Sequence, residues 1–196
     1  MPQALLSRNL LRKTSVIASL LTIAGCAGAP IVNNAYYDTG YAPLEYRAVD
    51  PLPVVVRGNP YAIPQAELDN AVADAMQGTT FGTTQRFAPA ADTVSAYRVV
   101  MLFNPGPTTY GGTLCRRPEP PSAVFGEAPA PRVAVSVALC RGDSPMVYAD
   151  GSIGTGGGPQ GPEFREGVQR LSMTLFTPKD FQKGGNNGNG NKTGFH

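Results

Sequence analysis

Histidine and tryptophan are almost missing from this chain. Its 196 residues include no tryptophan and one histidine, His196, which is the last residue. Catalytic triads and histidine-based metal sites need an imidazole held in a fixed position. A terminal histidine in a Gly/Asn-rich stretch is not held in this way. The sequence therefore predicts no catalytic residues, no metal site and no cofactor.

Clustered positive charge is also lacking. After residue 25 the longest basic run is Arg116-Arg117, and no ladder of aromatic residues accompanies it. The sequence therefore predicts no nucleic-acid binding. The formal net charge is +2, but three basic residues lie in the first 25 positions, and without them 13 basic residues face 14 acidic ones. The rest of the chain thus carries a net charge of −1.

The chain has no apolar run of the roughly 20 residues that a membrane span needs. The most apolar segment is residues 16–23, and Gly25, Gly28 and Pro30 break the chain soon after it. Basic residues precede this segment, and Ala24-Gly25 and Cys26 come directly after it. A charged head, a short apolar stretch and small residues are typical of a secretory signal peptide. We expect residues 1–25 to be such a signal. The alternatives are an ordinary signal peptide that leaves Cys26 as a free thiol, a buried Cys26 in an N-terminal helix, and a transmembrane anchor.

The residues Ile23-Ala24-Gly25-Cys26 resemble the lipobox of bacterial lipoproteins. The resemblance implies that the Cys26 thiol is diacylated, the signal removed and the new amino terminus acylated. In that family an Asp after the cysteine often marks retention in the inner membrane. Ala27 therefore implies the outer membrane, with the domain facing the periplasm.

With Cys26 assigned to lipid, Cys115 and Cys140 are the remaining pair of the three cysteines. Disulfides persist in the periplasm, and a bridge closing a 25-residue loop stabilises by about 3 kcal/mol in the chain-entropy model. We expect residues 108–116 to fold back as a strand on 97–104, which brings Cys115 near Cys140. Two free thiols or a metal site are the alternatives.

Two helices and at least four strands are expected. Glycine (23) and proline (19) are abundant, which favours short elements joined by loops. Apolar residues recur with helical spacing after Pro64 and after Pro162. Strands are predicted over 51–58, 97–104, 132–140 and 146–153. The prolines of the first segment either make it an edge strand or lie before its first ladder bond. Residues 79–91 are expected to form a loop.

These elements predict an α+β fold, with two helices packed on one face of an antiparallel sheet of four to five strands. The expected organisation is a signal over 1–25, a lipidated tether over 26–50, a periplasmic domain over 51–182 and a disordered Gly/Asn tail over 183–196. The domain resembles a family of small envelope lipoproteins of unknown function with β-α-β-β-β-α order. The matching residues are Ala91-Asp92 and Leu175-Phe176-Thr177-Pro178. That family implies no catalytic residues.

Three local motifs invite a functional interpretation. Gly154 to Gly158 comes after a strand and precedes a helix, but it lacks the Gly-Lys-Ser/Thr of a phosphate loop. Arg141-Gly142-Asp143 spells an adhesion tripeptide within ordinary turn chemistry, and Glu163 lies near Glu166. We interpret all three as structural. The sequence thus predicts a non-catalytic binding or structural module, with an envelope protein or the cell wall as partner. The alternative is a ligand-binding or hydrolytic domain with a pocket near the Gly-rich loop.

Overall fold

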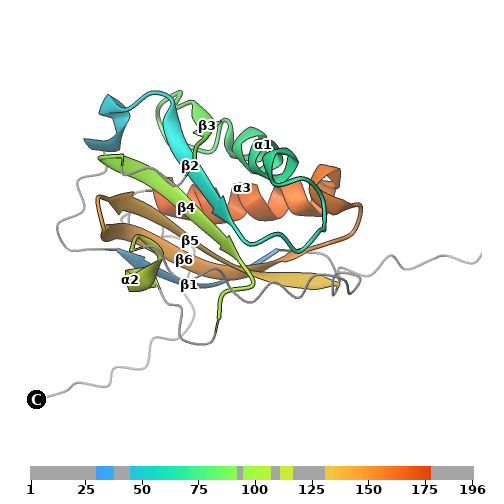
Figure 1. Ribbon diagram of the computed structural model, residues 1–196. Coiled ribbons are helices and arrows are strands. Elements are labelled where there is room, and N and C mark those ends of the chain that lie inside the picture. Colours follow the sequence, from blue (N-terminus) through green and yellow to red (C-terminus); the bar gives the residue numbers. More distant parts are fainter. Residues whose placement is uncertain (1–29, 38–44, 92–94, 107–110, 117–130, 178–196) are drawn as a thin grey trace, which may run out of the picture.

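The fold is a six-stranded mixed sheet with two helices on one face (Figure 1). The computed structural model describes residues 30–37, 45–91, 95–106, 111–116 and 131–177. The two helices are α1 (Gln65–Met76) and α3 (Pro162–Phe176). The predicted α+β class, with two helices on one face, is therefore confirmed. The predicted four- to five-stranded antiparallel sheet is wrong in strand number and direction.

The sheet has the strand order β1-β6-β5-β4-β2-β3. The pairs β1–β6, β6–β5 and β5–β4 are antiparallel, whereas the pairs β4–β2 and β2–β3 are parallel. The parallel part arises because α1 connects β2 to the later strands, and parallel strands need such a crossover. The strands are β1 (Ile31–Tyr37), β2 (Leu52–Arg57), β3 (Phe87–Pro89), β4 (Tyr97–Phe103), β5 (Arg132–Arg141) and β6 (Ser144–Gly154).

Strand β2 lies inside the sheet, so an edge strand, one of the two predicted explanations of its prolines, is wrong, and the other is confirmed. Its partners are β4 from Val54 onward and β3 over Leu52–Val54. Pro53 costs the sheet no ladder bond because its missing N–H precedes the first pair with β4. Strand β3 lies in the predicted loop 79–91, and a strand of three residues shows no periodicity from which to predict it.

Strand β1 corrects the expected tether. Residues 26–50 were expected to lack regular structure, yet Ile31–Tyr37 pair with β6 and a short 3-10 helix, η1, spans Glu45–Ala48. The ladder between β1 and β6 shifts between Val32 and Asn34, which marks a β-bulge. A bulge breaks the strict alternation of apolar and polar residues that reveals a strand in a sequence.

The main core lies between the helices and the sheet. The predicted apolar stripes of both helices are buried there, including Leu68 and Val72 of α1 and Phe164 and Leu171 of α3. Facing them are the alternate residues of β5 that the sequence places on one side: Val133, Val135, Val137 and Leu139. No helix within the described residues is long and apolar enough to cross a membrane.

The opposite face of the sheet carries a second, smaller apolar cluster. Leu114 and Cys115 cover it, and both are fully buried. They lie at the end of a four-residue helix, α2 (Gly111–Leu114), where the sequence predicts a strand over 108–116. That predicted strand is therefore wrong for the described residues 111–116. Gly111-Gly112 has no alternation of side chains to favour an extended segment.

Candidate functional site

Cys115 and Cys140 form the predicted disulfide, with their Cα atoms 5.6 Å apart. Cys115 directly follows the short helix α2, whereas the sequence predicts that it lies in a strand folded back on residues 97–104. Cys140 lies in β5 and faces away from α1 and α3, so the bridge joins α2 to the second face of the sheet. Both cysteines have no exposed surface, and the bridge is therefore part of the core.

Two arginines hold the same segment. Arg57 Nη1 donates to the carbonyl oxygen of Leu114 at 3.2 Å, and Arg98 Nη2 donates to that of Cys115 at 2.6 Å. Arg98 is 2% exposed, and its nearest described carboxylate, on the exposed Asp143, lies 3.7 Å away. The guanidiniums thus satisfy carbonyls at the end of α2 that would otherwise lack partners. Their role is structural.

The Gly-rich loop before α3 holds a carboxylate of this chain. A Cβ added at Gly154 would overlap the carboxylate of Glu163, and one at Gly156 would lie 3.0 Å from its Oε2. Because these contacts are made mainly by the end of the Glu163 side chain, a larger residue at either position would require that side chain to move.

The other two motifs are also used structurally. Gly142 and Asp143 form the two-residue turn of the β5–β6 hairpin, and Gly142 has a φ of 57°, which glycine adopts without strain. Glu166 accepts from Arg170 one helical turn later, at 2.7 Å. Glu166 is thus paired with Arg170, whereas the Glu163 carboxylate lies against Gly154 and Gly156.

A cluster of polar residues gathers at the end of the sheet next to η1. Glu45 Oε2 accepts from the Tyr97 hydroxyl at 2.8 Å and from Arg141 Nη1 at 3.3 Å. The hydrogen bond to Glu45 raises the pKa of Tyr97, because ionisation would place two negative charges together. The cluster thus joins η1, β4 and β5.

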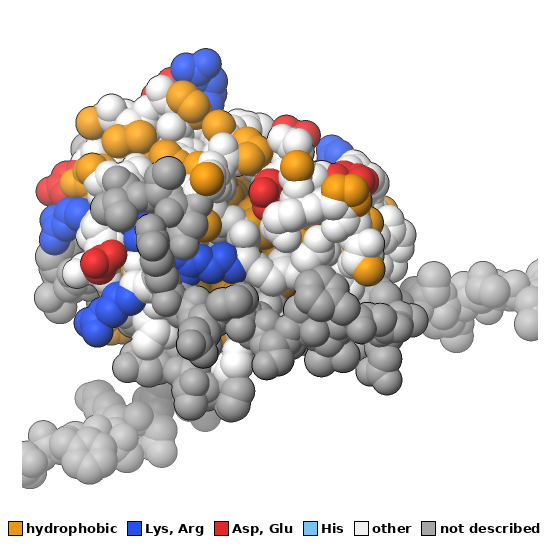
Figure 2. Space-filling model, viewed as in Figure 1, with side chains coloured by type: hydrophobic (Ala, Val, Ile, Leu, Met, Phe, Trp, Pro, Cys, Tyr) orange, Lys and Arg blue, Asp and Glu red, His pale blue; other side chains and the backbone are white. Residues whose placement is uncertain are grey.

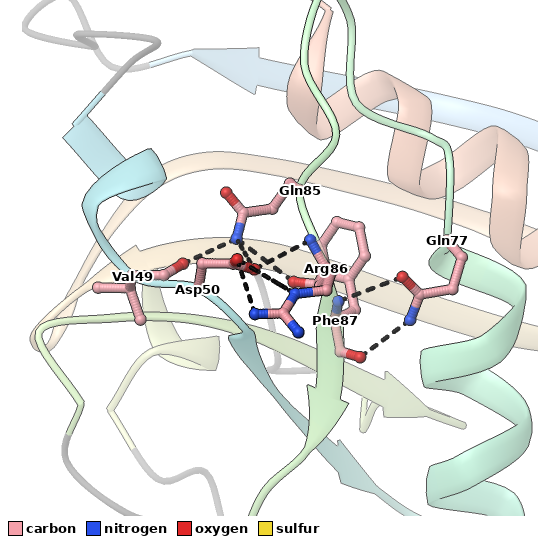
Figure 3. Close-up of polar contacts among 6 residues, drawn as sticks. All are labelled: Val49, Asp50, Gln77, Gln85, Arg86 and Phe87. Carbon is pink, nitrogen blue, oxygen red and sulfur yellow. Dashed lines mark hydrogen bonds and ion pairs between the residues drawn. The ribbon is translucent and has the colours of Figure 1, made fainter.

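A second ion pair lies beside the start of strand β2 (Figure 3). The guanidinium of Arg86 donates through Nε and Nη2 to Oδ2 of Asp50, at 3.1 Å and 3.0 Å, and its Nε also donates to Oδ1 at 3.3 Å. These bonds lower the pKa of the Asp50 carboxyl. The buried Gln85 donates to the carbonyl oxygen of Val49 at 2.7 Å, which ties the start of β3 to η1.

An exposed aromatic residue completes this region. Phe81 is 51% exposed, and its carbonyl oxygen accepts from Arg47 of η1 at 3.4 Å. In Figure 2, charged side chains border hydrophobic ones on the side where Figure 1 places η1 and β3. We call this region the η1 surface and define it by Glu45, Arg47, Asp50, Phe81, Arg86, Tyr97 and Arg141. The sequence does not reveal it because its members are spread over 97 positions.

Cys26, the predicted lipidation site, lies outside the described residues, as does the tail 183–196. In the part of the chain that the structure describes, no group of three or more His, Cys, Asp or Glu side chains is arranged to hold a metal ion. On the η1 surface, Glu45 pairs with Tyr97 and Arg141, and Asp50 pairs with Arg86, whereas Arg47 donates to the backbone carbonyl of Phe81.

Comparisons with known proteins find only distant similarity. No protein-family model matches the chain, and no curated protein matches it. Two solved structures of the PelC dodecamer from Paraburkholderia phytofirmans, one of them a point variant, are each 11% identical and cover 77% of this chain and 99% of theirs. Their TM-scores are 0.41 and 0.40, and likeness at this level carries no argument about function.

Proposed function

We propose that the chain is a lipoprotein, anchored through Cys26 in the outer membrane and facing the periplasm, and that its domain binds another envelope component without catalysis. The partner is an envelope protein or the cell wall. Support for the anchor comes from the sequence Ile23-Ala24-Gly25-Cys26 and the basic, apolar and small residues before it. The buried disulfide suits an oxidising compartment.

The η1 surface is the observation that carries the binding part of the proposal. It presents the exposed Phe81 among three arginines, and aromatic and arginine residues are enriched where binding energy concentrates in interfaces. Asp50 and Glu45 already hold Arg86 and Arg141 in place. A partner therefore meets side chains whose positions are fixed, which lowers the ordering cost of binding.

The anchor is tested by replacing Cys26 with Ser. The variant is expected to leave the membrane fraction, and mass spectrometry of the wild-type protein is expected to show acyl chains on residue 26. The substitution Ser19→Ala, within the apolar segment of the signal, is the matched control and leaves fractionation unchanged. An unchanged distribution of the Cys26→Ser variant, with no acyl mass on the wild type, refutes the anchor.

The binding surface is tested by crosslinking in intact cells. A photoreactive amino acid at Phe81 is compared with one at Met173, which is 47% exposed on α3. We expect one predominant adduct, with a protein or with peptidoglycan fragments, from position 81 alone. Phe81→Ala and Arg86→Ala, made separately in a chain crosslinked from Arg47, are expected to weaken that adduct. Equal adducts from positions 81 and 173 would contradict the assignment of this surface.

A further inference from the structure

The proposed anchor, Cys26, lies very close in sequence to the first strand of the sheet. Four residues, 27–30, separate Cys26 from Ile31, and five Cα steps span at most about 18 Å when fully extended. Pro30, the last of these residues, is itself buried in the domain. The start of β1 is therefore held within one short linker of any acyl chains on Cys26. The domain does not hang from a long tether.

Strand β1 is also the most exposed strand of the sheet. It lies at one end of the strand order, and six of its seven residues are exposed. Its large side chains include Ile31, Val32 and Tyr36, which are 50%, 37% and 48% exposed. No residue of β1 is charged. Exposed apolar residues thus occur at both ends of a neutral strand.

The composition of β1 suits the headgroup region of a bilayer better than its hydrocarbon. The outer edge of an edge strand has backbone N–H and C=O groups that need water or polar partners, which hydrocarbon lacks. Tyrosine places its ring at the membrane interface with its hydroxyl toward water. Asn33 and Asn34 lie between the apolar ends and carry no charge that would need to be desolvated.

We infer that the outer edge of β1 lies flat on the headgroup region of the bilayer in which Cys26 is anchored, with Ile31, Val32 and Tyr36 in contact with lipid. This inference rests on the proposed lipidation. The bulge between Val32 and Asn34 disrupts the edge ladder and disfavours the addition of a strand from another chain. Contact with a bilayer, unlike pairing with another strand, does not require a regular ladder of hydrogen bonds along the edge.

Side-chain contacts fix the orientation of the strand on the domain. The rings of Tyr36 and Tyr148 stack with centroids 5.1 Å apart, and the Tyr37 hydroxyl donates to the carbonyl oxygen of Thr174 at 2.9 Å. These contacts hold β1 to β6 and α3 from both sides of the sheet. The outward edge therefore moves with the whole domain, and its contact with lipid sets the domain's orientation.

The lack of tryptophan makes the inference directly measurable. Ile31→Trp, Tyr36→Trp and Phe81→Trp each introduce a single fluorophore. The mature lipidated proteins are reconstituted in vesicles of phosphatidylethanolamine and phosphatidylglycerol, with or without brominated acyl chains that quench nearby tryptophan. Phe81 is the matched control, because it is an aromatic residue of similar exposure that precedes β3, the strand at the opposite end of the sheet.

Quenching of about twofold or more is expected at positions 31 and 36, as for side chains inserted into the headgroup and acyl boundary, and little at position 81. Quenching at position 31 alone, or equal quenching at all three positions, overturns the inference. Emission at position 36 that depends on protein concentration without vesicles also overturns it, because a second copy then covers the edge.

Acyl mass and flotation of the Phe81→Trp protein with vesicles separate the two proposals. A protein that carries acyl chains and floats, without quenching at positions 31 and 36, refutes the contact of β1 with lipid and leaves the anchor intact. A protein without acyl chains refutes the anchor and with it the inference.

Discussion

Asp50 and Arg86 show how two residues distant in sequence fix the geometry of the η1 surface. Their side chains form a two-point contact, with Nη2 and Oδ2 3.0 Å apart, although they are 36 positions apart in the chain. Asp50 lies just before β2, and Arg86 directly precedes β3. The pair therefore aligns the starts of two parallel strands. Planar guanidinium and carboxylate groups favour this arrangement.

The stability provided by this pair should depend on pH. The lowered pKa of Asp50 means that folding favours its ionised form. Its contribution is thus fully present above the ordinary aspartate pKa of about 3.9 and lost as pH falls through the lower folded value. Asp50→Asn should lower the urea midpoint at pH 7, and the difference from wild type should shrink near pH 3.

A double-mutant cycle with Arg86→Gln tests whether the ion pair causes the pH-dependent stability. Asp50→Asn should cost little in the Arg86→Gln background, because the partner of the carboxylate is already missing. Both residues are exposed, so the effect is small. A difference between Asp50→Asn and wild type that stays constant from pH 7 to pH 3 would contradict the role of the ion pair.

Helix α3 depends on a close approach to the sheet at one glycine. A Cβ added at Gly167 would overlap Cγ2 of Ile153, a β6 residue with no exposed surface. The helix therefore packs on β6 with backbone rather than side chain at this point. Any larger residue must move the helix or distort the strand.

Gly167→Ala should destabilise the domain by about 1–2 kcal/mol in urea unfolding. Overpacking destabilises by about 1–3 kcal/mol, and the better helix propensity of alanine offsets at most about 1 kcal/mol of this. Met173→Ala, on the exposed side of α3, is the control and should change stability by less. Ile153→Ala should cost less in the Gly167→Ala background than alone, since it removes the overlap. Additive costs would argue against direct contact.

The two long helices were predictable, whereas the edges of the sheet were not. Leu68, Val72 and Met76 repeat with the helical period, and Pro64 and Gly78 mark the ends, so local sequence suffices for α1. Strand β3 has three residues, and the bulge in β1 interrupts its alternation. Their places depend on pairing partners far along the chain, which no local pattern encodes.

The η1 surface was equally inaccessible to sequence reasoning. Glu45, Tyr97 and Arg141 meet because the antiparallel pair of β4 and β5 brings residue 97 opposite residue 141. The disulfide was predictable from the number of cysteines, because assigning Cys26 to lipid leaves a single pair. Its surroundings were not, since the arginines that hold Leu114 and Cys115 come from β2 and β4.

For the whole molecule, the disulfide stabilises the packing of α2 against the second face of the sheet. Replacing both Cys115 and Cys140 with Ala should lower the free energy of unfolding by about 2–4 kcal/mol, because the unfolded chain gains the freedom of a 25-residue loop. Thermal unfolding of the mature protein measures this loss. A reductant should lower the melting temperature of the wild type and leave that of the double variant unchanged.

Cys26→Ser is the matched control, since it removes a thiol that takes no part in the bridge. Its domain should melt like the wild type when both are compared in detergent. A double variant as stable as the wild type would mean that Arg57 and Arg98 alone hold α2 on the sheet.

Gln77 has a consequence for how copies of this protein can associate. From the end of α1, its side chain accepts from the Phe87 N–H at 3.3 Å and donates to the Phe87 carbonyl oxygen at 2.9 Å, as a neighbouring strand would (Figure 3). Two residues on, Pro89 has no N–H to offer. The β3 edge is thus closed to strand addition. Extension of the sheet from one molecule to another is therefore left to the β1 edge, and pairing of two β1 strands ends at two copies.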